Sequence, residues 1–116
     1  MQEERREKIR IEESLTVRHS PAKSLFISSS ETKNISSGGL CFPALQRLEP
    51  EMALDLDIDL PGFKEPIKAE AKVIWLSEIS DINHRYDVGV QFAKISSTDH
   101  SKILHYISSK FDNLNM

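Results

Sequence analysis

The sequence has a single cysteine, Cys41, among its 116 residues. One thiol cannot form an internal disulfide, and no second cysteine is available for a thiolate metal site. No apolar run approaches the ~20 residues that a membrane-spanning helix needs, and the first ten residues are charged where a secretion signal would be apolar. These absences favour one small domain, located in the cytoplasm and without contact to a membrane.

An excess of positive charge is also missing. The chain has 15 Lys and Arg against 18 Asp and Glu, a net charge of −3, and only 7% aromatic residues. Proteins that bind nucleic acids depend on a surplus of basic residues for phosphate contacts, and single-strand binders add interleaved aromatic side chains. We therefore expect no nucleic-acid partner. An anionic ligand should be small and should be bound by a few positioned side chains rather than by a broad positive surface.

Motifs for catalysis and for metal binding are absent as well. The histidines lack metal-ligand spacing, and the sequence contains neither a Gly-x-Ser-x-Gly elbow nor a phosphate-binding loop. Asp55, Asp57 and Asp59 start like a calcium-binding loop. The glycine and the glutamate that such a loop requires at its sixth and twelfth positions are replaced by Leu60 and Pro66. We expect no enzyme, no metal and no cofactor.

The chain does contain a series of strand patterns. The clearest is an alternation of apolar and polar residues from residue 52 to residue 60, closed by Pro61-Gly62. Further strands are expected over residues 15–19, 24–35, 40–42, 67–76 and 86–95. Trp75 lies within one of these strands, and we interpret it as a residue of the core or its rim rather than as a platform for base stacking.

The last segment changes its period. Ser96 to Asp99 supplies helix N-cap candidates, and the predicted helix covers residues 98–113. Its apolar stripe, with spacings of three and four, consists of Ile103, Leu104, Ile107 and Phe111. We predict an all-β fold with a C-terminal helix, in which a six-stranded antiparallel, split, Greek-key-like β-barrel spans residues 11–116 and packs against the helix stripe.

Residues 1–13 differ in composition, because four positive and five negative charges occur there together. We interpret this segment as a flexible N-terminal arm. It contains Arg6-x-x-x-Arg10, and Asn34-x-Ser36-x-x-Gly39 follows at the end of the second predicted strand. Either motif alone is weak, because arginine pairs at this spacing are frequent and Asn-Ser-Gly clusters are ordinary turns.

In this order, and followed by Gly89-Val90-Gln91-Phe92 on the last strand, the two motifs resemble the PilZ domain family. The resemblance extends over essentially the whole chain. It implies a bacterial receptor for cyclic di-GMP that changes conformation on binding this second messenger and signals to a downstream effector protein. The ligand contacts that the resemblance implies are Arg6, Arg10, Asn34, Ser36 and Gly39, with Arg5 and Gly38 as further candidates.

The chemistry of these residue types suits such a ligand. The resemblance implies that the arginines grip phosphate and stack on guanine, and a guanidinium can do both because it is planar and permanently charged. Asn34 and Ser36 would hydrogen-bond a guanine edge. Gly38 and Gly39 permit a positive φ and place no Cβ where a base would approach the backbone.

Two alternatives stay open from the sequence. One is a PilZ-like adaptor between proteins that binds no nucleotide, although family members of that kind typically lack the arginine pair. The other is a small barrel that binds single-stranded nucleic acid, which the acidic balance and the low aromatic content disfavour.

Overall fold

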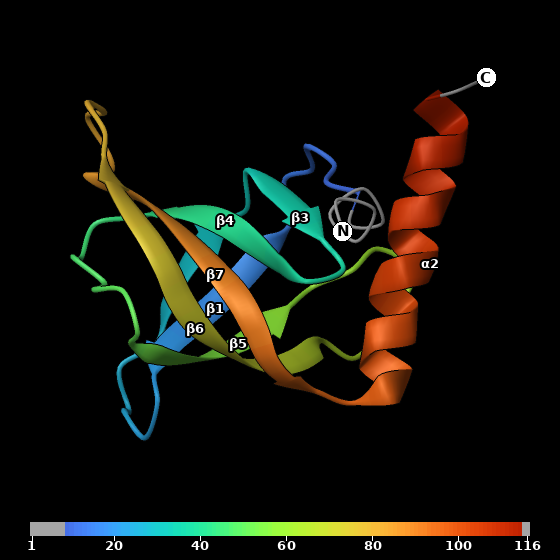
Figure 1. Cartoon of the computed structure of the whole chain (residues 1–116), viewed down its shortest axis with the longest axis horizontal. Helices are drawn as coiled ribbons and strands as arrows, with labels where there is room; N and C mark the ends of the chain where they lie inside the picture. Colours follow the sequence, from blue (N-terminus) through green and yellow to red (C-terminus); the bar gives the residue numbers. More distant parts are fainter. Residues whose placement is uncertain (1–8, 115–116) are drawn as a thin grey trace, which may run out of the picture.

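The computed structural model describes residues 9–114, which form a β-sheet and one helix (Figure 1). The predicted class, all-β with a C-terminal helix, is confirmed. The strands are β1 (Thr16–Pro21), β2 (Ser28–Glu31), β3 (Asn34–Ser36), β4 (Gly39–Ala44), β5 (Ala53–Ile58), β6 (Ile67–Glu78) and β7 (Tyr86–Ile95), and the helix is α2 (Ser97–Leu114).

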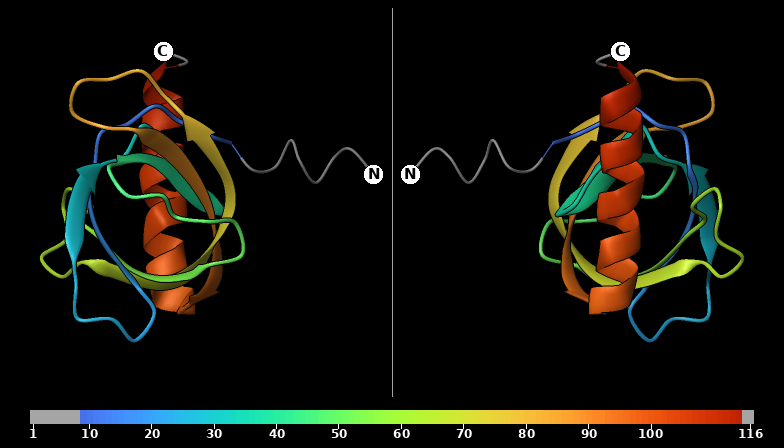
Figure 2. Two further views of the ribbon diagram at one scale, coloured as in Figure 1. Left: turned by 90° about the vertical axis from the view of Figure 1, so that its left-hand side faces the viewer. Right: turned by 90° about the vertical axis from the view of Figure 1, so that its right-hand side faces the viewer.

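All seven strands belong to one antiparallel sheet with the order β2-β1-β5-β6-β7-β4-β3. The sheet curls into a half-barrel. In Figure 2, which looks along this half-barrel from either end, α2 lies across one opening. The connections between β1 and β2 and between β6 and β7 lie at the end opposite the helix (Figure 1).

The described sheet has seven strands rather than the expected six, because the predicted strand 24–35 divides. Leu25, Phe26 and Ile27 are 96%, 83% and 69% exposed in the connection after β1. The remainder forms β2 and β3, which lie on opposite edges of the sheet. The division has a local cause: the Thr32 N–H donates to Leu15 O, whereas the Lys33 N–H donates to Cys41 O. Two consecutive residues thus pair with different neighbours.

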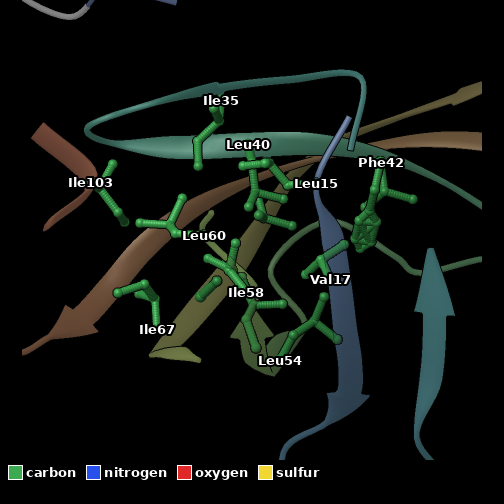
Figure 3. Close-up of a cluster of buried hydrophobic side chains, with 14 of the residues drawn as sticks. Leu15, Val17, Ile35, Leu40, Phe42, Leu54, Ile58, Leu60, Ile67 and Ile103 are labelled. Atoms are coloured by element: carbon green, nitrogen blue, oxygen red, sulfur yellow. The ribbon is translucent and has the colours of Figure 1, made fainter. Parts of the chain in front are cut away.

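The core fills the concave side of the sheet, where inward side chains of the strands meet α2 (Figure 3). Inward and outward side chains alternate along β5 as predicted, and Leu54, Leu56 and Ile58 are each at most 2% exposed. Burying a side chain of this size contributes roughly 1.5–3 kcal/mol. Other core residues drawn in Figure 3 are Leu15, Val17, Ile35, Leu40, Phe42, Leu60, Ile67 and Ile103.

The buried stripe of α2 is narrower than predicted. Ile103 and Ile107 are buried, together with Tyr106, but Leu104 is 44% and Phe111 39% exposed. The helix begins one residue before the predicted start. Ser96 acts as the N-cap, because its Oγ accepts the Asp99 N–H at 3.1 Å.

Candidate functional site

The described chain begins next to β3, where Ile11 and Ile35 exchange two backbone hydrogen bonds of 3.0 Å. Asn34 and Ser36 flank Ile35 and share the opposite face of the strand. Arg10 directly precedes Ile11, so its side chain reaches both of them. Its guanidinium donates to Asn34 Oδ1 at 2.5 Å and to Ser36 Oγ at 3.3 Å.

The structure thus brings together Arg10 and the Asn-x-Ser-x-x-Gly turn, two features 24 residues apart. Arg5 and Arg6, the other predicted arginines, lie outside the described residues. Within residues 9–114 the Arg10 guanidinium bonds only to neutral groups. No carboxylate of this range pairs with it.

The turn itself is held by the Ser36 hydroxyl, which accepts the Gly38 N–H at 3.2 Å and donates to Gly39 O at 3.4 Å. Gly38 and Gly39 permit a positive φ but do not adopt one, because Gly62 is the one glycine with a left-handed φ. Gly39 serves close packing instead. A Cβ there would lie 2.0 Å from Val90 O on the neighbouring strand β7.

Strand register then places the outward side chains of β6, β7, β4 and β3 in two rows across the sheet. The first row is Trp75, Gly89, Cys41 and Asn34, and the second is Lys72, Gln91, Gly39 and Ser36. The middle of the first row is occupied by two small residues, Gly89 and Cys41, and the middle of the second by Gln91 and Gly39. A trough results, with Trp75 on one side and Asn34, Ser36 and Arg10 on the other.

This trough is a pocket of about 400 Å³ on the convex side of the sheet. Every predicted contact within residues 9–114 except Gly39 lines it. The lining residues are Arg10, Asn34, Ser36, Gly38, Leu40, Cys41, Ile74, Trp75, Gly89, Val90 and Gln91. Burial raises the pKa of the Cys41 thiol, so the floor of the pocket carries no thiolate charge near neutral pH.

Trp75 is a pocket wall rather than a core residue, because β6 has an irregularity at this point. Val73 pairs with Val90 and Trp75 with Gly89, so Ile74 is an extra residue in β6. Such a bulge redirects the side chains that follow it. Ile74 and Trp75 are consecutive in the chain, and both face outward, with exposures of 45% and 44%.

The indole of Trp75 lies over Gly89. A Cβ at Gly89 would lie 2.2 Å from both Cε2 and Nε1 of the ring. Sequence reasoning missed this arrangement, which depends on pairing between two strands. A signal was present in Val73-Ile74-Trp75, because three large apolar residues in succession interrupt an otherwise alternating strand.

The other cations near the pocket are already paired. Lys33 Nζ lies 2.8 Å from Asp87 Oδ1, and the hydrogen bond to Asp87 raises the pKa of Lys33. Lys72 Nζ lies 3.4 Å from Glu51 Oε1. Of these three cations, Arg10 alone has no carboxylate partner within residues 9–114.

The turn and the segment after Arg10 both contact α2. His100 Nε2 on the helix donates to Ser37 O at 3.1 Å, and the Tyr106 hydroxyl donates to Glu13 Oε1 at 2.7 Å. Burial raises the pKa of Tyr106, and its bond to Glu13 does so further. The helix is thus connected to both sides of the motif pair.

Neither a metal site nor a membrane-spanning helix is present in the part of the chain that the structure describes. Residues 9–114 contain no group of three or more His, Cys, Asp or Glu side chains placed to hold a metal ion. No helix within the same range is both long and apolar enough to span a lipid bilayer.

The described chain is thus a small β-domain, a seven-stranded half-barrel with a terminal helix across one opening. It has a pocket on its convex side, where an arginine bonds to an Asn-x-Ser-x-x-Gly turn. The family model of the PilZ domain matches residues 4–109. The chain belongs to the PilZ domain family. No curated protein matches it in sequence.

Solved structures share the fold at low sequence identity. The inhibitor of motility MotI/DgrA from Bacillus subtilis has a TM-score of 0.76 and 22% identity, and the match covers 91% of this chain and 51% of that one. YcgR from Escherichia coli in complex with c-di-GMP has a TM-score of 0.70 and 17% identity, over 96% of this chain and 48% of YcgR.

The complex of K. pneumonia MrkH with c-di-GMP has a TM-score of 0.70 and 16% identity, over 93% of this chain and 53% of MrkH. The chain therefore spans about half the length of each of these three proteins.

Proposed function

We propose that this PilZ domain is a cytoplasmic receptor for cyclic di-GMP and that the trough between Arg10 and Trp75 binds the nucleotide. One observation carries the proposal: a guanidinium without an acidic partner in the described chain faces a half-exposed indole across a floor of small residues. Charge and a flat aromatic surface are the two features that a ligand of phosphodiesters and purines requires. The c-di-GMP complexes of YcgR and MrkH, which share the fold, support it.

Each wall of the trough suits one part of the ligand. An arginine can bond a phosphate through two N–H groups or read the N7 and O6 acceptors of guanine. The indole of Trp75 offers a face on which a base can stack. Gly89 has no side chain, so the indole can lie close to the sheet as one wall of the trough.

The polar groups of the turn are partly used by the protein itself. Asn34 Oδ1 accepts from Arg10, which leaves the side-chain NH2 of Asn34 to donate to guanine O6 or N7. Ser36 is 2% exposed, and its hydroxyl holds the turn in shape. Arg6 supplies a second guanidinium in this proposal, and Arg5 a further one, both from outside the described residues.

The receptor signals through α2 in this proposal. A ligand that contacts Arg10 and the turn acts on both hydrogen bonds of the helix, those of His100 and Tyr106. A shift of the helix changes the surface that a downstream effector protein meets. The signal thus requires no enzymatic step in this chain.

Isothermal titration calorimetry of the purified chain tests the proposal. We expect saturable binding of cyclic di-GMP and much weaker binding of GTP and of cyclic di-AMP. If cyclic di-GMP gives no heat of binding in a sample whose fold is verified by circular dichroism, the receptor function is refuted. The alternative of a protein–protein adaptor that binds no nucleotide would then stand.

A further inference from the structure

Gln91 is an exposed residue in the second row of outward side chains, the row Lys72, Gln91, Gly39 and Ser36. It lies on β7 between Lys72 of β6 and Gly39 of β4. Gly39 has no side chain, and Lys72 Nζ lies 3.4 Å from Glu51 Oε1. The Gln91 side chain therefore stands uncovered at the edge of the pocket that it lines. Within residues 9–114 no hydrogen-bond partner contacts its amide.

The position of Gln91 relative to Trp75 follows from the strand geometry. The indole lies over Gly89, and Gln91 is the next residue of β7 on the same face. Residues i and i+2 of a strand are roughly 6.6 Å apart. A base stacked on the indole would therefore lie within reach of the Gln91 amide.

We propose that Gln91 reads the edge of the base that stacks on Trp75. The inference rests on the proposed function, and it adds a specificity-determining residue that belongs to neither arginine motif nor turn motif. An amide provides a carbonyl acceptor and an NH2 donor side by side. Proteins that bind an unpaired base between aromatic side chains read its Watson–Crick edge with such groups.

Guanine and adenine differ in the hydrogen-bond donors and acceptors of their Watson–Crick edges, and this difference allows a test of Gln91. The Watson–Crick edge of guanine has two adjacent donors, N1–H and the 2-amino group, next to the O6 acceptor. Adenine has one exocyclic donor, N6, next to the N1 acceptor. A glutamine can pair with either edge by turning its amide. A glutamate can only accept, so it pairs with the two donors of guanine and with one donor of adenine.

Two substitutions test the role of Gln91. Gln91→Met keeps the length of the side chain and removes its hydrogen bonds, so binding of cyclic di-GMP should weaken about tenfold. Gln91→Glu adds a negative charge that repels both dinucleotides alike. The ratio of the Kd values for cyclic di-AMP and cyclic di-GMP cancels this repulsion, and it should be about tenfold higher for Gln91→Glu than for Gln91→Met.

Gln46 provides the matched control. It is exposed and lines a different hollow of the surface, beside His19 and Leu45. Gln46→Met and Gln46→Glu should leave both the affinity and the ratio at their wild-type values. Thermal unfolding of each variant verifies the fold, and Gln91 is exposed, so its replacement costs little stability.

The outcomes separate this inference from the receptor function. If the wild type binds cyclic di-GMP and Gln91→Met binds it equally well, Gln91 does not contact the base and the assignment is overturned. An unchanged ratio in Gln91→Glu has the same meaning. If the wild type binds no cyclic di-GMP, the proposed function fails, and the assignment of Gln91 fails with it.

Discussion

Replacement of Gly89 by alanine tests whether a base of the ligand stacks on the indole of Trp75. The added methyl would lie 2.2 Å from Cε2 and Nε1 and 2.7 Å from Cζ2 of the ring. Non-bonded carbon atoms prefer separations of about 3.5–4.0 Å. The ring must therefore move by more than 1 Å (about the difference of these distances), and because it is 44% exposed it can swing outward.

The expected loss follows from the stacking energy. Stacking of a base on an aromatic side chain contributes about 1–3 kcal/mol, which corresponds to roughly 5- to 150-fold in affinity. Overpacking in a rigid core costs about 1–3 kcal/mol of stability. The cost at Gly89 should lie at the low end of this range, because the indole is free to move toward solvent.

Trp75 is the single tryptophan of the chain, so its fluorescence reports on this pocket alone. In the wild type, cyclic di-GMP should change the emission on binding, and Gly89→Ala should require a higher concentration for the same change. Calorimetry gives the affinities independently of the fluorophore.

Trp75→Ala supplies the control, since it removes the surface on which the methyl acts. If Gly89→Ala weakens binding by displacing the indole, it should have little further effect in the Trp75→Ala background. Two additive losses would show that Gly89 acts without Trp75. Wild-type affinity of Gly89→Ala would contradict the stacking wall altogether.

Two further predictions concern charge. Arg10→Ala should weaken the binding of cyclic di-GMP by roughly 10- to 100-fold, through the loss of a charge-assisted contact worth roughly 1.5–3 kcal/mol. The control Arg47→Ala removes a guanidinium that is bonded to Glu49, and this variant should bind as the wild type does. If calorimetry gives equal affinities for the wild type and both variants, Arg10 is not part of the site. His19 is 5% exposed and stacks on Phe42, and burial lowers its pKa from 6.5 to about 4. Because the pKa of His19 is lower in the folded state than in the unfolded state, the unfolded state binds more protons between pH 4 and pH 6.5. The free energy of unfolding therefore falls as the pH drops through this range, by about 3 kcal/mol in total. Urea unfolding at pH 7 and pH 4.5 should show a smaller acid-induced loss in His19→Gln than in the wild type, and an equal loss in both would show that His19 does not carry this pH dependence.

The sequence was most informative where a pattern is local. The alternation of residues 52–60 predicted β5 because every second side chain faces the core. The change of period after Ser96 predicted α2 to within one residue at each end. The order of the two motifs predicted the family, which the match over residues 4–109 shows.

The features that sequence reasoning missed depend on pairing between distant strands. The division of residues 24–35 arises because Thr32 and Lys33 bond to segments near opposite edges of the sheet, and neither residue type signals this. The outward turn of Trp75 requires the bulge in β6 and the absence of a side chain at Gly89. Strand register decides both, and no short stretch of sequence encodes register by itself.

The trough is assembled from four separate stretches of chain, because Arg10, the turn after β3, the bulge of β6 and the middle of β7 each contribute one side of it. No fragment that lacks β7 or the residues before β1 can contain the complete pocket. A molecule bound there would contact residues as far apart in the sequence as Arg10 and Gln91. Its presence shifts the folding equilibrium of the entire sheet toward the native state by mass action, so resistance to heat becomes a measure of occupancy.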